Sequence, residues 1–299
     1  MKVLISGASG LIGSALADSL SAGGHDVVRL VRTQQTARAG EIAWQPENRW
    51  IDAPRLEGID AVVHLAGENI ARRWTKRRKA RIRESRVRGT TLLAEALARA
   101  GQKPRCLISA SAIGYYGDRG DELLDERSEI GSGFLADVCR QWEQATRAAA
   151  DGGIRVVNAR FGVVLSKNGG ALARMLLPFR VALGGRIGSG RQFISWIAID
   201  DAVRVIQHAI TNSTLAGPIN AVAPNPVTNA EFTKALGRAL SRPTVFPMPA
   251  AVARLAFGQM ADEVLLSSAR VRPERLLESG YQFRFAELAP ALGHVLGKS

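Results

Sequence analysis

The chain has 299 residues, a formal net charge of +13 and a hydrophobic fraction of 46%, which allows a sizeable core in one large domain or two ordinary ones. No apolar run approaches the roughly 20 residues of a membrane span, and the first one, in "MKVLISGASG", is too short for a signal peptide. Cys106 and Cys139 fit reduced thiols, and no metal-spaced cluster of histidine and cysteine occurs. We therefore expect a cytoplasmic protein without a metal ion or membrane contact.

Short apolar runs alternate with helical segments over residues 1 to 165. The runs are rich in Val, Ile and Leu without strict alternation, as in strands buried on both faces. This order predicts an α/β fold with a doubly wound parallel sheet. The predicted strands are "KVLIS" (2–6), "DVVRLVR" (26–32), "DAVVHLAG" (60–67), "RCLISASA" (105–112) and "IRVVNARF" (154–161), and the predicted helices lie at 11–24, 88–101 and 133–153.

The pattern changes after residue 165. A helix and a glycine-rich loop are predicted up to residue 192, followed by an extended stretch and a helix that begins near Asp200. We expect a dinucleotide-binding domain over 1–165, to which 193–222 returns. Residues 166–299 otherwise form a smaller, mainly helical domain on the substrate side.

The segment "ISGASGLIG" carries glycines with GxxGxxG spacing between a strand and a helix. Gly7 permits a tight turn, Gly10 lets the backbone approach a pyrophosphate, and Gly13 allows close packing of helix and sheet. The start of the helix offers free N–H groups to phosphates. The sequence therefore predicts a dinucleotide site that includes Gly7, Ser9, Gly10, Leu11, Ile12 and Gly13.

The second predicted strand ends in Arg32, and no Asp or Glu occurs from Val27 to Ala39. An enzyme that prefers NAD commonly has an acid there to hold the ribose hydroxyls. A guanidinium instead suits the additional phosphate of NADP, through its charge and planar donors. We therefore predict NADP(H) as the cofactor.

The segment 72–88, "RRWTKRRKARIRESRVR", holds ten Lys or Arg residues against Glu84 and contributes most of the positive charge. Its only aromatic residue is Trp74, so it offers no stacking platform for bases. We interpret it as a solvated helix face that partly meets an anionic cofactor, and we expect no nucleic-acid partner.

The glycine motif is followed by "HLAG" (64–67), "SRVRGT" (85–90), "SASAIGYYG" (109–117) and "ISWIAIDDA" (194–202). In this order the motifs resemble an extended or atypical short-chain dehydrogenase/reductase. More narrowly, "LAGENIA", "RWTKRRKARIRESRVRGT", "RFGVVL" and "MADEVLLSSARVRPERLLESGYQF" resemble bacterial epimerase-family proteins of the YfcH type, which end in a domain of unknown function.

This resemblance implies several contacts. Leu65 and Ala66 would pass beside the adenosine part of the cofactor. Arg86 would meet a phosphate or the ribose, and Arg81, close to one helical turn earlier, would join it.

The stretch "LISASAIGYYGDRGD" (107–121) is typical of a buried strand that ends at a cleft. It would place Ser109 beside the cofactor and Ser111, Tyr115 and Tyr116 beside the substrate. In the superfamily a lysine four residues after the catalytic tyrosine lowers its pKa from about 10, but none of the three tyrosines here has one. The aligned helix carries Leu135 and Cys139 at those two positions instead.

Three hypotheses remain open. In the first, Tyr115 or Tyr116 donates a proton while Ser111 holds a substrate oxygen, and the protein is an NADP(H)-dependent oxidoreductase of a small carbonyl or sugar-like molecule. In the second, the protein binds NADP(H) with little turnover, as a sensor or regulator. In the third, another cleft residue acts, with Asp118, Arg119 and Arg160 as candidates. A nucleotide-sugar epimerase is a further alternative.

Overall fold

A computed structural model describes residues 1–33 and 38–298. Within this part of the chain the central element is an eight-stranded sheet, in which every neighbouring pair is parallel except the β3–β4 edge. The order of its strands is β12 (Gly217–Ala221), β8 (Arg155–Phe161), β6 (Cys106–Ala112), β5 (Ala61–His64), β1 (Lys2–Ser6), β2 (Asp26–Arg32), β3 (Glu41–Gln45) and β4 (Trp50–Ile51).

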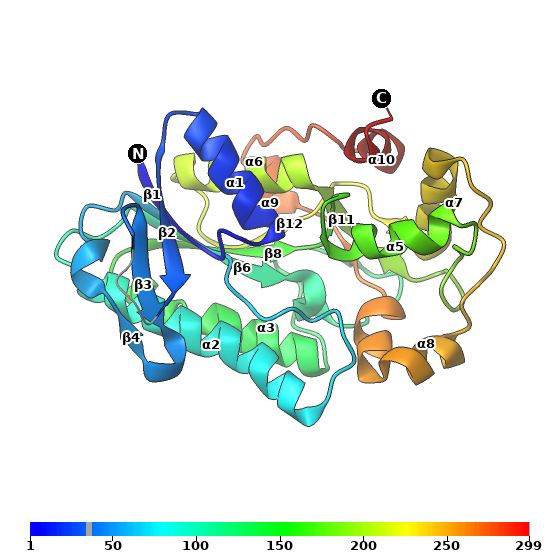
Figure 1. Cartoon of the computed structure of the whole chain (residues 1–299), viewed down its shortest axis with the longest axis horizontal. Coiled ribbons are helices and arrows are strands. Elements are labelled where there is room, and N and C mark those ends of the chain that lie inside the picture. Colours follow the sequence, from blue (N-terminus) through cyan, green and yellow to red (C-terminus); the bar gives the residue numbers. More distant parts are fainter. Residues whose placement is uncertain (34–37, 299) are drawn as a thin grey trace.

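Helices cover both faces of the sheet, and this confirms the predicted doubly wound α/β fold (Figure 1). On one face lie α1 (Leu11–Ala22) and α6 (Ile199–Thr211), which pack against each other. On the other lie α2 (Lys76–Arg99), α3 (Phe134–Gln144) and the short α4 (Arg147–Asp151). Successive strand residues point to opposite faces, so Val3 and Ile5 join one core cluster while Leu4 joins the other.

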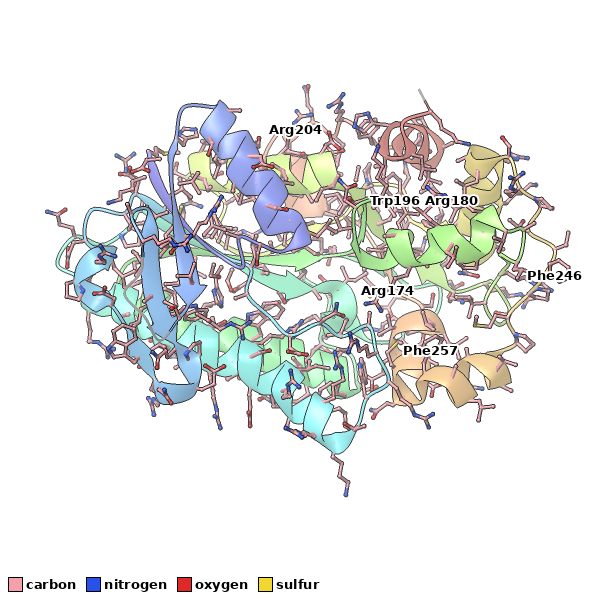
Figure 2. All side chains as sticks on the ribbon, in the orientation of Figure 1. Arg174, Arg180, Trp196, Arg204, Phe246 and Phe257 are labelled. Atoms are coloured by element: carbon pink, nitrogen blue, oxygen red, sulfur yellow. The ribbon has the colours of Figure 1, made fainter. Side chains whose placement is uncertain are left out.

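The other helices are α5 (Gly170–Arg180), α7 (Asn229–Leu240), α8 (Ala250–Phe257), the π-helical turn η4 (Ala261–Leu265), α9 (Glu274–Glu278) and α10 (Leu288–Leu296). Beyond the carboxyl end of the sheet, α5, α7 and α10 surround a separate core that contains Trp196, Phe232 and Leu292 (Figure 2). Helix α8 and η4 pack instead near Trp74, and α9 packs against β12. Two-residue and three-residue strands form small pairs: β9 (Val163–Leu165) with β11 (Trp196–Ala198), β10 (Phe193–Ile194) with β13 (Val227–Thr228), and β7 (Leu123–Leu124) with β14 (Arg270–Val271). Short 3-10 turns are η1 (Pro46–Asn48), η2 (Ala53–Leu56) and η3 (Ile113–Tyr116).

The basic segment found in the sequence forms the start of α2. Its first turn is capped by Thr75, whose hydroxyl accepts a hydrogen bond from the Arg78 N–H at 3.2 Å. Several of its cations have acidic partners, as in the Arg83–Asp137 pair at 2.8 Å, and the segment is therefore partly neutralised within the protein. Across the described residues, no helix combines the length and apolar character that a bilayer crossing requires.

A chain of hydrogen bonds joins β1, β5 and α2 beneath the glycine loop. The ring of His64 contacts the hydroxyl of Ser6 through Nδ1 at 2.6 Å and that of Thr90 through Nε2 at 2.9 Å, and all three side chains are buried. Burial disfavours the charged imidazole and lowers the pKa of His64 to about 4. The neutral His64 ring therefore links β1, β5 and α2 through its two hydrogen bonds.

The free energy of unfolding should fall as the pH drops from about 6.5 to about 4. In this range His64 is protonated in the unfolded chain but stays neutral in the folded protein, so protons stabilise the unfolded state. Wild type should lose about 2 kcal/mol more than His64→Gln between pH 7 and pH 4.5. Urea unfolding at both pH values measures this difference. Equal losses in the two proteins would show that His64 does not carry the effect.

Candidate functional site

The glycine loop is shaped by backbone contacts that leave no room for side chains. Gly7 has a positive φ of 69°, and its carbonyl accepts the N–H of Gly10 at 2.9 Å. A Cβ atom at Gly13 would overlap the Gly7 carbonyl oxygen, so the first turn of α1 packs directly on the loop. The first N–H groups of α1 have no acceptor within the helix. Since Ser9 and Gly10 are exposed, these donors face the edge of the sheet where a phosphate can approach.

The segment after β5 passes beside this loop. The N–H groups of Leu65 and Ala66 both donate to the Ser6 hydroxyl, at 3.1 and 3.3 Å. A Cβ atom at Gly7 would lie 2.9 Å from the backbone of each of these two residues. Because β1 lies between β5 and β2, the crevice here is the point at which the strand order reverses, where such sheets bind their ligands.

Arg32 is the last residue of β2, at the same edge of the sheet, and it is exposed. Its guanidinium has no ion pair with another residue in ranges 1–33 and 38–298. An uncommitted cation beside the crevice is suited to a phosphate on the adenosine ribose.

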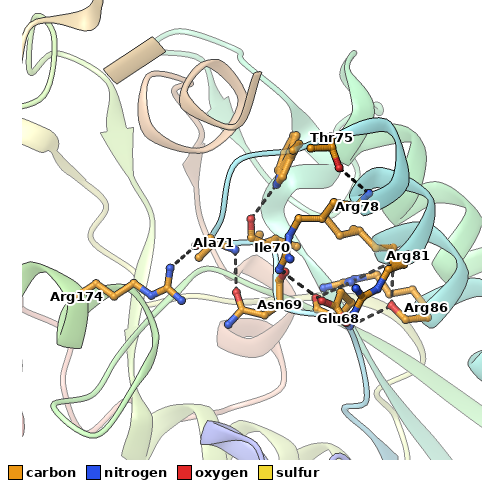
Figure 3. A network of polar contacts seen from close by, with 12 residues as sticks. Glu68, Asn69, Ile70, Ala71, Thr75, Arg78, Arg81, Arg86 and Arg174 are labelled. Carbon is orange, nitrogen blue, oxygen red and sulfur yellow. Dashed lines mark hydrogen bonds and ion pairs between the residues drawn. The ribbon is translucent and has the colours of Figure 1, made fainter. Parts of the chain in front are cut away.

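A polar network lies between the crevice and α2 (Figure 3). The Glu68 carboxylate pairs with Arg78 at 3.4 Å and with Arg81 at 3.2 Å. Arg86 donates through Nη1 to the carbonyls of Glu68 and Ile82, at 3.0 and 3.1 Å. Arg81 is therefore held at the surface by a carboxylate. Arg86 instead bonds neutral carbonyls, which leaves its charge available to a ligand.

A cavity of about 720 Å³ opens beyond the ends of β6 and β8. Leu11 lines it at the glycine-loop end, and Arg86 lines it from α2. The remaining walls come from η3, α3, the segment 161–164 after β8, α5, α7 and η4. The cavity thus continues from the dinucleotide crevice toward the C-terminal elements, as a substrate pocket would.

The predicted catalytic hydroxyls mostly belong to a buried network under this cavity. Ser111 donates to Glu143 Oε1 at 2.7 Å, and Arg160 donates to both oxygens of the same carboxylate at 2.8 Å. Arg160 also donates to the hydroxyl of Tyr116 at 2.9 Å, and Tyr116 in turn donates to Asn220 at 2.8 Å. Arg160 is buried and Glu143 is 13% exposed, so they form a largely buried ion pair whose remaining hydrogen-bonding groups are satisfied by neighbouring hydroxyls.

Three residues that we expected to contact the substrate or the cofactor are buried in the structure. Tyr116 has no exposed surface, and burial raises its pKa to about 12, so its hydroxyl stays protonated within the network. Ser111 is 3% exposed, and its proton is engaged by Glu143. Ser109 is fully buried inside β6, which separates it from the surface where a cofactor would lie. Nothing in the sequence alone reveals that Glu143 binds the Ser111 hydroxyl.

Tyr115 differs from its neighbour. Its side chain is half-buried, and the Arg160 guanidinium lies 3.5 Å from its ring centroid. Its hydroxyl has no hydrogen-bond partner among the described residues. Tyr115 sits on η3 between Gly114 and Gly117, which both line the cavity. Tyr115 itself is not among the lining residues, and it packs against a cluster that includes Tyr116 and Val222.

The two positions of the superfamily's tyrosine and lysine are apolar here, and both face the cavity. Leu135 and Cys139 line it from α3. Burial raises the pKa of the Cys139 thiol to about 12, so it stays protonated at neutral pH. Of the other candidates, Asp118 lines the cavity and accepts the Ser268 N–H at 3.0 Å, whereas Arg119 is paired with Glu122 at 2.6 Å.

A residue of the C-terminal elements, Glu263, caps the first turn of α3. Helix α3 has no side-chain cap of its own, since Gly133 precedes it. The Glu263 carboxylate of η4 accepts the N–H groups of Phe134 and Leu135 at 3.1 and 2.8 Å. It therefore caps, from another part of the chain, the helix that carries Leu135 and Cys139. The sequence marked this segment only as part of a family motif.

The sheet, the glycine loop and the adjoining cavity define a dinucleotide-binding protein of the doubly wound class. The chain belongs to the NAD dependent epimerase/dehydratase family, which matches residues 3–221, and a domain of unknown function, DUF1731, matches residues 248–295. The predicted resemblance to the epimerase family is confirmed.

Similar proteins span the full length of this chain. An epimerase family protein of Mycobacterium tuberculosis is 50% identical over 98% of this chain and 96% of its own. Human epimerase family protein SDR39U1 is 40% identical over 99% of this chain and 100% of its own. The crystal structure of human SDR39U1 with NADPH has a TM-score of 0.91 at 39% identity and full coverage of both chains.

A second solved structure is named a nucleoside-diphosphate sugar epimerase of Corynebacterium glutamicum. It is 42% identical with a TM-score of 0.83, and the match covers 99% of this chain and 58% of that one. UDP-sugar epimerases of Bacillus cereus share the fold at 16% to 18% identity.

Replacing Arg160 with Met should leave the Glu143 carboxylate buried without its cation. We expect the free energy of unfolding to drop by about 3 to 5 kcal/mol. Arg147→Met is a matched control, because its pair with Asp151 is exposed and should contribute under about 1 kcal/mol. Urea denaturation compares the two variants, and similar losses would contradict a structural role for the Arg160 pair.

Proposed function

We propose that this chain binds NADPH at the glycine loop, with Arg32 against the 2′-phosphate. The main support is the Arg32 guanidinium, which has no ion pair in the described part of the chain and lies at the end of β2, beside the crevice where the strand order reverses. The neighbouring glycine loop has no room for a Cβ atom at Gly7 or Gly13. The first turn of α1 would bind the diphosphate, Leu65 and Ala66 would flank the adenosine, and Arg86 would face the nicotinamide half. The human relative solved with NADPH supports this assignment.

Arg32→Glu should weaken NADPH binding at least tenfold while leaving NADH binding unchanged or improved, because a charge-assisted contact to phosphate becomes repulsive. Fluorescence titration with each nucleotide measures both affinities. Arg29→Glu is the matched control, since Arg29 is exposed on the same strand three residues earlier. An equal loss in both variants would mean that only general charge matters.

We further propose that the bound cofactor serves carbonyl reduction. NADPH supplies a hydride, two electrons and one hydrogen nucleus, to a carbonyl carbon. The apolar walls formed by Leu135 and Val138 exclude water from this end of the cavity, and the Arg86 guanidinium attracts the oxygen on which negative charge develops. Arginine stays protonated, so the proton for that oxygen must come from elsewhere, and we assign it to the Tyr115 hydroxyl. Water then restores the proton to Tyr115.

A regulatory protein with little turnover is the second candidate. It is favoured by the internal engagement of the Ser111 and Tyr116 hydroxyls and by Leu135 and Cys139 at the acid–base positions. Nucleotide-sugar epimerisation remains an equal alternative to reduction, because one similar structure carries that name. Both enzyme functions would use a hydride transfer in the same cavity. Reduction would consume NADPH, whereas epimerisation would start from the oxidised cofactor, which takes a hydride from the sugar and returns it, so that no nucleotide is consumed.

Tyr115→Phe should lower kcat for NADPH-dependent carbonyl reduction at least about a hundredfold, since general acids typically contribute that much. NADPH affinity should stay unchanged. In Tyr116→Phe we expect wild-type kcat with about 1 to 3 kcal/mol lower stability, because that hydroxyl serves the buried network. NADPH consumption and nucleotide binding are measured together on a panel of carbonyl compounds and UDP-sugars.

The outcomes of this panel separate the candidates. Binding without consumption of NADPH on any compound would favour the regulatory function. Interconversion of UDP-sugars would favour the epimerase. Full activity of Tyr115→Phe would remove that residue as the proton donor.

A further inference from the structure

The part of the cavity formed by the C-terminal elements has apolar walls. They are formed by side chains from α5, β10, α7 and η4, elements that lie outside the central sheet. These side chains are Met175, Phe193, Ile194, Phe232, Val264 and Leu265. A ligand that extends from the nicotinamide position toward the C-terminal elements therefore meets hydrocarbon over most of its surface.

The polar side chains among these walls are already engaged by the protein. Gln192 donates through Nε2 to two main-chain carbonyls, both at 3.0 Å. The Ser195 hydroxyl donates to one carbonyl at 2.7 Å and accepts an N–H at 2.9 Å. Asn229 accepts the Ile187 N–H through Oδ1 at 2.8 Å, and its amide NH₂ has no acceptor among the described residues. These walls therefore offer few free partners for the several hydroxyl and phosphate groups of a sugar or a second nucleotide. Each buried group without a partner weakens binding.

One cation stands at the rim of the same cavity. Arg174 projects from α5 across the rim and donates through Nη1 to the Ala71 carbonyl (Figure 3). It is exposed and has no ion pair with another residue of the described chain. Beside it, Asn69 accepts the Ala71 N–H through Oδ1 at 2.8 Å, and its amide NH₂ has no protein acceptor among the described residues.

These donors suit a single anionic group. The partner that Arg174 now has is a neutral carbonyl, and a carboxylate would make a stronger, charge-assisted bond. The Asn69 amide could donate to the second oxygen of the same carboxylate. The rim therefore offers a place for one carboxylate, and the walls offer a place for the chain attached to it.

We propose that the substrate is an aliphatic carbonyl compound that carries one carboxylate, with its chain in the apolar part of the cavity and its carboxylate on Arg174. This specificity rests on the proposed NADPH-dependent reduction, and under it nucleotide sugars would not be the preferred ligands. Arg174 and Arg86 bond carbonyls of the same short segment, those of Ala71 and Glu68, and both line the cavity. One guanidinium would hold the carboxylate and the other would face the carbonyl oxygen.

Decanoate serves as a probe of this site, because it has the proposed charge and apolar chain and cannot accept a hydride. Its binding is titrated by calorimetry on the full chain with NADPH at saturation. We expect Arg174→Gln to weaken decanoate binding about tenfold, while 1-decanol binds both proteins equally. Arg180→Gln is the matched control: Arg180 is exposed on the same helix and does not line the cavity (Figure 2).

A second pair of variants locates the chain of the probe. Val264 is 40% exposed and lines the cavity, whereas Val252 on α8 is 50% exposed and does not. Val264→Asp should weaken binding of both decanoate and 1-decanol at least tenfold by placing a charge in the apolar wall. Val252→Asp should leave both affinities unchanged.

NADPH affinity, measured in the same samples, separates the two proposals. If NADPH fails to bind, the proposed function fails. If NADPH binds but decanoate does not, or if Arg174→Gln and Arg180→Gln bind decanoate alike, the substrate class is overturned and the cofactor assignment stands. UDP-glucose binding in the low micromolar range that competes with decanoate would also overturn it, because the same cavity would then take a nucleotide sugar.

Discussion

The contact between the first turn of α1 and the Gly7 carbonyl determines the geometry of everything around it. Because a Cβ atom at Gly13 would overlap that oxygen, the helix can approach the loop only with glycine at this position. The close approach directs the free N–H groups of α1 toward the crevice at which the strand order reverses. It also lets the Leu65–Ala66 backbone pass within contact of Gly7, so that the crevice has two walls and leads into the cavity.

Beneath the cavity a second constraint operates. The Arg160–Glu143 pair is largely buried, and a buried pair is stable only when its remaining hydrogen-bonding capacity is satisfied. Ser111 and Tyr116 satisfy it, so their hydroxyls are engaged within the protein. Two residues at the edge of the network are less committed. Tyr115 offers a hydroxyl without a partner, and Arg86 offers a charge bonded only to neutral carbonyls.

The strands and the glycine loop could be predicted from sequence because they depend on local features. A run such as "KVLIS" followed by GxxGxxG specifies its own strand, turn and helix through residue types that are adjacent in the chain. The hydrogen bond from Ser111 to Glu143 could not be predicted. The two residues lie 32 positions apart in the chain, and only tertiary packing brings them together. Arg174 is a similar case. In the sequence it is one arginine among many, and its place at the cavity rim follows from how α5 sits beside residues 69–71.

The C-terminal segment that matches DUF1731 has a structural role in this protein. The Glu263 carboxylate accepts hydrogen bonds from the first N–H groups of α3, and Met260 packs against Trp74 and Val138. The dinucleotide-binding domain should therefore not be stable without the tail. Removal of the tail would leave α3 uncapped and would expose the apolar side chains of Trp74 and Val138. The two segments are best regarded as one structural unit, and a transfer of the tail onto another dinucleotide-binding domain would require an α3 whose first N–H groups lack a cap.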